Sequence, residues 1–128
     1  MASVYVNNLV INAGSDFSQS FTLESSGNNS VLDLNGYTVE SQMRKWAGGS
    51  TATSFNTEIV DPPSLGQVIV SLGSTQTTEL KPGRYVYDVL ITDPLGYKNR
   101  VIEGMVLVRE GVTRWWQILK SESDNKML

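Results

Sequence analysis

The stretch Leu80-Lys81-Pro82-Gly83-Arg84-Tyr85-Val86-Tyr87-Asp88 decides the fold of this chain of 128 residues. Pro82-Gly83 predicts a tight turn, because proline fixes φ and glycine accepts positive φ. A strand follows immediately, since side chains over residues 84–92 alternate with a period of two. Its apolar residues fall on both faces, which indicates a central position in a sheet.

The same stretch predicts a tyrosine corner. In immunoglobulin-like sandwiches, a tyrosine early in the sixth strand donates a hydrogen bond to the backbone a few residues upstream. Tyr85 is placed to make this bond, and Leu80 is placed to close the base of the core. We therefore interpret Leu80, Pro82, Gly83 and Tyr85 as structural residues, and expect positive φ at Gly83.

The remaining chain shows the same period of two, interrupted by Gly, Asn and Pro. In the last strand, simple alternation predicts that Val101 and Ile102 face opposite sides of the sheet. Residues 75–81 lack alternation and predict a short helical turn. We expect about seven strands, over residues 4–11, 17–24, 37–44, 54–60, 67–72, 84–92 and 97–108.

The prediction is an all-β fold, a single immunoglobulin-like antiparallel β-sandwich. We expect the sandwich domain to cover residues 1–113. Residues 114–128 form a C-terminal extension with little to bury, which we expect to be mobile or to dock on a partner.

Composition argues against several partners. The net charge is −3 and the ten basic residues form no run, so a nucleic-acid partner is not expected. No apolar stretch approaches the ~20 residues of a membrane span. Met1-Ala2-Ser3-Val4 has no basic or long apolar signal region, so we expect synthesis in a cytoplasm.

No catalytic set is evident in the sequence. Histidine and cysteine are absent, so the usual base at neutral pH, the thiolate nucleophile and the commonest metal ligand are missing. We expect no enzyme activity, no cofactor and no metal. Asp88 and Glu103 lie on strands expected to be neighbours and could form a glycosidase pair. Our interpretation is that such carboxylates form cross-strand pairs with Arg44, Lys98 or Arg100.

Trp115-Trp116 is the strongest functional signal. With Ile118 and Leu119 it forms an apolar cluster after the last strand, and aromatic anchors are enriched at the centres of protein interfaces. We predict that these four residues bind a partner, although one tryptophan could instead close the open end of the sandwich. Trp46, at a glycine-rich loop tip, is a weaker interface candidate.

A series of short motifs follows one another between residues 10 and 113: Ala13-Gly14-Ser15-Asp16-Phe17, Phe21-Thr22-Leu23, Leu32-Asp33-Leu34-Asn35-Gly36-Tyr37-Thr38, Gln42-Met43-Arg44-Lys45, Thr75-Gln76-Thr77, Pro82-Gly83-Arg84-Tyr85-Val86-Tyr87-Asp88-Val89 and Val101-Ile102-Glu103-Gly104. In order and spacing this series resembles small immunoglobulin-like virion structural domains of tailed phages, of the cyanophage type. Its first half is similar to the N-terminal domains of some phage baseplate proteins.

The resemblance implies a non-enzymatic virion structural protein, made late in the host cytoplasm and built into the particle. The leading expectation is a capsid decoration protein on the outside of the head, bound to the major capsid protein. Alternatives are an adaptor among tail, baseplate or neck components, with self-association in either case. A third alternative is a carbohydrate-binding module for host attachment, with Tyr5, Trp46 and Tyr97 as its aromatic face.

Overall fold

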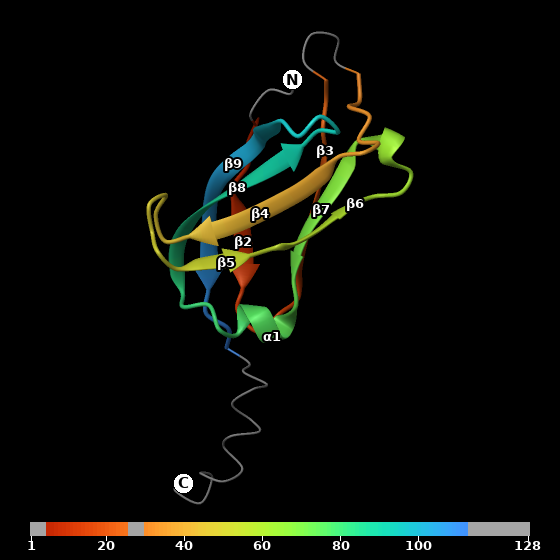
Figure 1. Ribbon diagram of the computed structural model, residues 1–128. Helices are drawn as coiled ribbons and strands as arrows, with labels where there is room; N and C mark the ends of the chain where they lie inside the picture. The colour runs from red at the N-terminus through yellow and green to blue at the C-terminus, as the bar shows by residue number, and fades with distance from the viewer. Residues whose placement is uncertain (1–4, 26–29, 113–128) are drawn as a thin grey trace, which may run out of the picture.

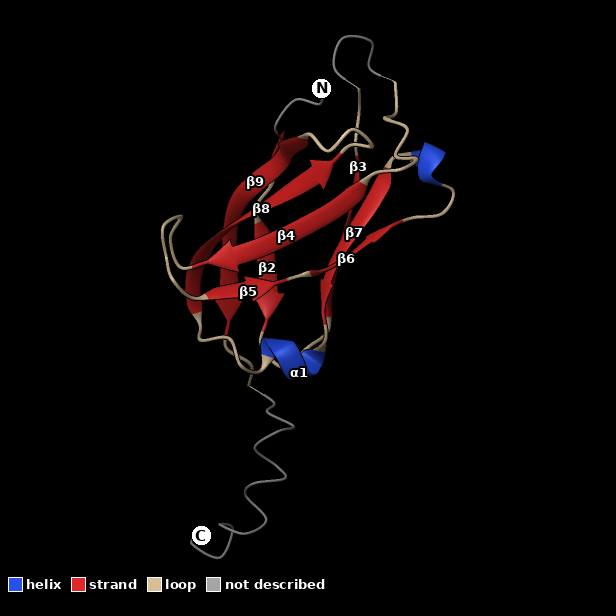
Figure 2. Cartoon of the chain, in the orientation of Figure 1, coloured by secondary structure: helices blue, strands red, loops and turns tan. Residues whose placement is uncertain are grey.

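The computed structural model describes residues 5–25 and 30–112 (Figure 1). Within these residues, two β-sheets pack on each other, with two short helical turns at their ends (Figure 2). The predicted fold class, an all-β sandwich, is confirmed.

The larger sheet has the strand order β1–β9–β8–β4–β5, with β2 also paired to β9, and the smaller has the order β3–β7–β6. Among the described strands, β1 and β2 run parallel to β9 and the other pairs are antiparallel. The strands are β1 (Tyr5–Val6), β2 (Leu9–Asn12), β3 (Phe17–Thr22), β4 (Thr38–Arg44), β5 (Ala52–Ser54), β6 (Asn56–Ile59), β7 (Gln67–Leu72), β8 (Gly83–Thr92) and β9 (Lys98–Arg109); the helical turns are η1 (Pro63–Leu65) and α1 (Ser74–Thr77).

Two of the predicted strands are each divided in the structure. The strand predicted over residues 4–11 breaks at Asn7–Asn8 into β1 and β2. The strand predicted over residues 54–60 contains the point where the chain leaves the larger sheet for the smaller. Phe55 lies at that point, with its side chain buried in the core and its N–H bonded to the Ser41 carbonyl at 3.0 Å. Side-chain alternation with a period of two indicates an extended backbone, but it does not indicate that the chain passes from one sheet to the other.

The simple alternation predicted for the last strand is wrong at Val101. The pairing of β8 with β9 shifts register between Val89 and Leu90, so that Val101 is an extra residue on β9. Val101 and Ile102 are consequently both buried in the core. Such a bulge inserts one residue and re-aims the side chains that follow.

The core lies between the two sheets. Inward-facing side chains alternate with outward-facing ones along β7 and β8, as the sequence predicts. Fully burying one such aliphatic side chain contributes about 1.5–3 kcal/mol. The largest fully buried side chains are Ile11, Leu23, Leu34, Met43, Leu72, Ile91, Ile102, Val68, Val70, Val89, Val101 and Val106.

The α1–β8 connection has the geometry of a tyrosine corner. The Tyr85 hydroxyl donates to the Lys81 carbonyl at 2.7 Å. Gly83 has φ of +141°, in the region that favours glycine, and Leu80 is buried in the core. The Lys45 ammonium lies 4.6 Å from the centre of the Tyr85 ring, a cation–π contact.

The helical turn α1 is held by buried polar contacts. Thr77 is fully buried, and its hydroxyl accepts the Gly14 N–H at 3.0 Å and lies 2.9 Å from the Ser15 carbonyl. The Asp16 carboxylate accepts the N–H of Ser74, the first residue of α1, at 2.7 Å. These contacts tie the β7–β8 connection to the β2–β3 connection, so both lie at one end of the sandwich.

At the break between β1 and β2, the backbone carbonyl of Asn7 packs directly against Gly104. A Cβ atom at Gly104 would overlap the Asn7 carbonyl, so only glycine allows this approach. The Tyr87 hydroxyl donates to that carbonyl at 2.6 Å, and the Asn8 side-chain oxygen accepts the Met105 N–H at 3.0 Å. Burial raises the pKa of Tyr87 to about 12.

The first prediction concerns the corner. Tyr85→Phe should lower the free energy of unfolding by about 0.5–1.5 kcal/mol, because one hydrogen bond to a backbone carbonyl is lost. Urea unfolding measures the change. Tyr97→Phe is the matched control, since that side chain is 68% exposed, and it should leave the midpoint unchanged. An unchanged midpoint for Tyr85→Phe would contradict the structural role.

The second prediction concerns Tyr87. Its pKa is raised from 10.0 to about 12, so the folded chain holds the phenol proton more tightly than the unfolded chain. The resulting stability is present below pH 10 and is lost as pH rises through about 12. Tyr87→Phe should therefore lose stability at neutral pH, and its deficit relative to the wild type should narrow across that window.

Urea midpoints of both proteins along the pH series measure this deficit. The component of the phenolate absorbance that titrates near pH 12 should also be absent in Tyr87→Phe. A deficit that stays constant through the window would show that the Tyr87 phenol is not protected.

Candidate functional site

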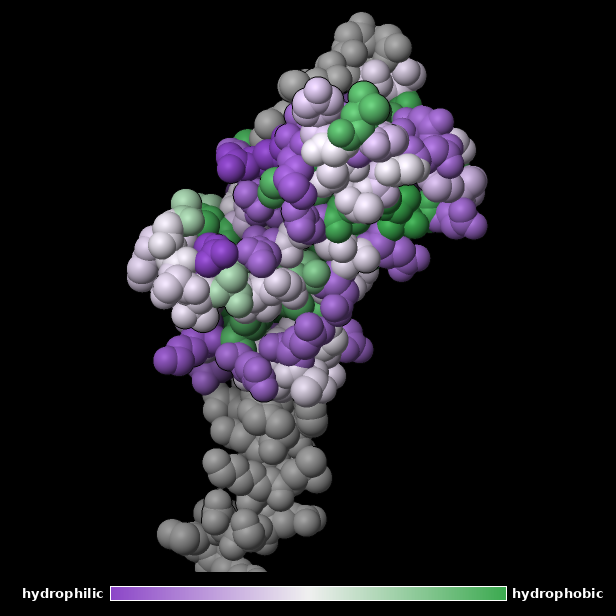
Figure 3. Space-filling model, in the orientation of Figure 1, coloured by the Kyte–Doolittle hydropathy of each residue, from purple (hydrophilic) through white to green (hydrophobic). Residues whose placement is uncertain are grey.

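The outer face of the larger sheet carries a broad, shallow groove of about 860 Å³ across β4, β5, β8 and β9. Its position follows from the alternation of β8, whose odd-numbered residues from Tyr87 to Ile91 face the core while Val86, Asp88 and Leu90 face outward. Figure 3 shows separate green apolar areas set among purple polar side chains on the visible side of the molecule.

Four apolar side chains form what we call the sheet patch: Val10, Val86, Met105 and Leu107. Val86 lies opposite Met105 across β8 and β9, and Val10 lies opposite Leu107 across β2 and β9. Val10, Met105 and Leu107 are 51%, 49% and 43% exposed. The register therefore gathers apolar side chains from three strands at one place on the surface.

Charged side chains border the patch. Asp88 and Glu103 lie directly opposite each other on β8 and β9, where two like charges destabilise a sheet. Arg100 offsets this: its Nε lies 3.3 Å from the Asp88 carboxylate and its Nη1 lies 3.5 Å from the Glu103 carboxylate. The predicted cross-strand pair is confirmed for Asp88 with Arg100, whereas Glu103 pairs with Arg100 along the same strand, β9. Such exposed pairs contribute only about 0–1 kcal/mol each.

The other two cations expected to pair with carboxylates, Lys98 and Arg44, have different partners. Lys98 pairs with Glu40 at 3.2 Å, as predicted. Arg44 instead uses its guanidinium on the Gly49 carbonyl at 2.6 Å and on the Gln42 side chain at 3.1 Å. Arg44 therefore braces the β4–β5 loop.

That loop presents Trp46. The Gly49 N–H donates to the Trp46 carbonyl at 2.8 Å, which closes a tight turn next to the Arg44 contact. The Trp46 side chain is 63% exposed, and the neighbouring Ala47 lines the groove. A tryptophan on a braced loop beside an apolar patch has the features of an interface anchor.

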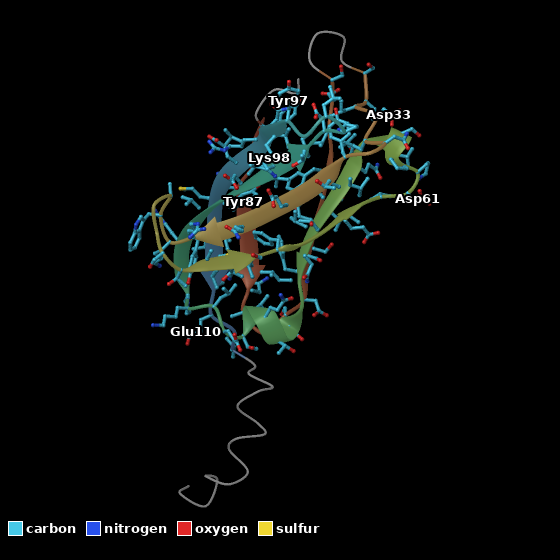
Figure 4. The ribbon with its side chains drawn as sticks, viewed as in Figure 1. Asp33, Asp61, Tyr87, Tyr97, Lys98 and Glu110 are labelled. Atoms are coloured by element: carbon cyan, nitrogen blue, oxygen red, sulfur yellow. The ribbon has the colours of Figure 1, made fainter. Side chains whose placement is uncertain are left out.

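The aromatic residues expected to share one face are dispersed. Trp46 follows β4, whereas Tyr97 precedes β9 at the other end of the same sheet. The seven residues of β4 lie between the two ends, about 20 Å at the rise of a strand. Figure 4 shows Tyr97 at the end of the sandwich remote from Glu110. Tyr5 lies on β1 at the sheet edge, with its hydroxyl on Glu24 at 3.0 Å.

The strongest sequence candidates, Trp115, Trp116, Ile118 and Leu119, lie outside the described residues, so their docking role stays a prediction. The sheet patch was missed by sequence reasoning. The apolar residues on both faces of β8 were the available signal, but they were interpreted only as evidence of a central strand. Leu80, Pro82, Gly83 and Tyr85 lie at the α1–β8 corner, as a structural role requires.

Comparisons with known proteins give distant likenesses. No family model matches the chain, and no curated protein matches it. Among solved structures, the internalin-like protein lmo2027 of Listeria monocytogenes is 12% identical with a TM-score of 0.41, over 84% of this chain and 28% of that one. A family 123 glycoside hydrolase from Clostridium perfringens is 12% identical with a TM-score of 0.40, over 80% of this chain and 22% of that one.

The chain therefore spans less than a third of the length of either neighbour. The part of the chain that the structure describes contains no helix with the length and apolar character that a membrane crossing needs.

Proposed function

We propose that this chain is a non-enzymatic structural protein of a virion, which decorates the capsid by docking the outer face of its larger sheet on the capsid lattice. The observation that carries the proposal is the sheet patch, Val10, Val86, Met105 and Leu107, bordered by the Arg100 ion pairs. An apolar centre with a polar rim is the usual anatomy of a protein–protein interface.

The chemistry of this face suits a protein partner. Carboxylates and guanidinium groups both line the groove, so its field does not select a polyanion. The phage-like motif series supplies the virion setting and the capsid as the leading partner. A tail, baseplate or neck adaptor would use the same face against a different neighbour. Glycan attachment is less well supported, because Tyr5, Trp46 and Tyr97 do not share a face.

Magnitudes indicate that the sheet patch does not act alone. Its four side chains are already partly buried, so completing their burial supplies roughly 3–6 kcal/mol. Association costs about 4–15 kcal/mol in lost freedom of motion. A second contact is therefore needed for stable attachment. The segment Trp115–Leu119 carries two indoles and two aliphatic side chains, enough for several kcal/mol more at ~25 cal/mol per Å².

The third prediction tests the sheet patch. Met105→Glu and Leu107→Glu, made together, should reduce occupancy on purified virions by roughly tenfold or more, with little change in the melting temperature. Leu95→Glu is the matched control, since Leu95 is 83% exposed in the β8–β9 turn, and it should bind as the wild type does. Full occupancy by the double variant would show that the chain docks through a surface other than the sheet patch.

The fourth prediction tests the C-terminal segment. Deleting residues 115–128 should leave the sandwich folded but abolish incorporation into particles. Thermal melting of the truncated chain, beside its occupancy on virions, measures both effects. Full occupancy would assign docking to the sandwich alone, and loss of folding would assign both tryptophans to the core.

A further inference from the structure

The strand β3 is an open edge of the smaller sheet. Its only partner among the described strands is β7. The Leu23 N–H donates to the Gly66 carbonyl at 2.8 Å, in register with the β3–β7 pairing. Hydrogen-bonded pairs alternate along an antiparallel ladder. The backbone N–H and C=O groups of the odd-numbered residues of β3 therefore point toward β7. The N–H and C=O groups of Ser18, Ser20 and Thr22 therefore point to the free edge.

This edge is the longest continuous one among the described strands. Its six residues, Phe17–Thr22, contain no charge and no proline, the devices that normally protect an edge. Among the other described edges, β5 and β6 have three and four residues, and β1 and β2 are separated by the Asn7–Asn8 break. The Ser20 carbonyl accepts a hydrogen bond from the side-chain amide of its neighbour Gln19, at 2.9 Å.

A groove of about 360 Å³ opens beside this edge, between β3 of one sheet and β1 of the other. Phe21, Leu23 and Ile102 line the groove but are themselves buried, and Tyr5 and Glu24 lie at its border. A strand added to β3 would direct every second side chain toward this groove. The groove therefore leaves space for a large side chain opposite Phe21.

The chain itself contains a matching segment. Residues 113–120 read Thr-Arg-Trp-Trp-Gln-Ile-Leu-Lys, rich in the β-branched and aromatic residues that suit strands. We propose that residues 113–120 of one copy add to β3 of a second copy as a fourth strand of its smaller sheet. The contact joins two copies of this chain, so in the virion role proposed above it is the second contact, made between neighbouring copies. Its test uses the isolated chain and does not depend on that role.

Charge and register agree in this pairing. Arg114 and Lys120 flank the segment, and Asp16 and Glu24 flank β3. An antiparallel alignment that sets Lys120 opposite Asp16 sets Trp115 opposite Phe21, beside the groove. Arg114 then lies opposite Thr22, two residues from Glu24. One oxygen of Glu24 accepts the Tyr5 hydroxyl at 3.0 Å, which leaves its second oxygen for Arg114.

The reach of the chain favours a second copy over the same copy. The strand β9 ends at Arg109, opposite Asn12, at the end of the sandwich where β3 begins. The alignment sets residue 113 opposite Leu23, just past the other end of β3, and the six residues of β3 span about 20 Å. The four steps from Arg109 to residue 113 extend to about 14 Å at most. No length remains for the reversal of direction that a contact within one copy requires.

The experiment uses the full chain with Trp46→Phe, so that fluorescence reports Trp115 and Trp116. Emission and sedimentation are followed from about 1 µM to about 1 mM. We expect emission to shift to shorter wavelength and the mass to rise together with concentration. Ser20→Pro should weaken this association by roughly tenfold or more, because it removes an edge N–H that β7 does not use. Ser20→Ala is the matched control and should associate normally.

Charge reversal provides a test that does not depend on proline. Glu24→Arg and Arg114→Glu should each weaken association, and the two together should restore it. If the charge reversals leave association unchanged, the proposal is overturned. An emission shift that does not depend on concentration would also overturn it, because the segment would then bind to its own copy. A chain that stays monomeric throughout the range would overturn it as well.

Discussion

The contact of the Asn7 carbonyl with Gly104 determines where the N-terminal strands lie, and both proposed surfaces depend on it. The missing side chain of Gly104 admits the carbonyl, and the Tyr87 hydroxyl binds it at 2.6 Å. On one side of this junction, β2 runs along β9 and brings Val10 beside Leu107. On the other, β1 places Tyr5 against β3 and forms the wall of the groove there.

Sequence reasoning succeeded where local chemistry determines structure. Alternation identified the extended segments. Pro82-Gly83 before Tyr85 identified the tyrosine corner, because a few adjacent residues determine the geometry of a turn. It failed where the structure of a segment depends on the strand with which that segment pairs. The extra residue at Val101 exists only relative to β8. The change of sheet at Phe55 leaves no local mark, because the backbone stays extended on both sides of it.

The candidate site was predictable only in part, for a related reason. Apolar residues on both faces of β8 show that both faces meet something, but not which face meets the core and which is left for a partner. Met105 and Leu107 join the sheet patch through the pairing of β9 with β2 and β8. The cation that Asp88 and Glu103 share was predictable in kind, since opposed carboxylates need one, and Arg100 supplies it.

An image of the intact particle, detailed enough to orient the sandwich, tests the central claim most directly. The account predicts density for this domain on the capsid surface, with Met105 and Leu107 of the larger sheet against a neighbouring protein. Density in which this face is open to solvent, and the contact is made by the smaller sheet or the β8–β9 turn, would contradict it.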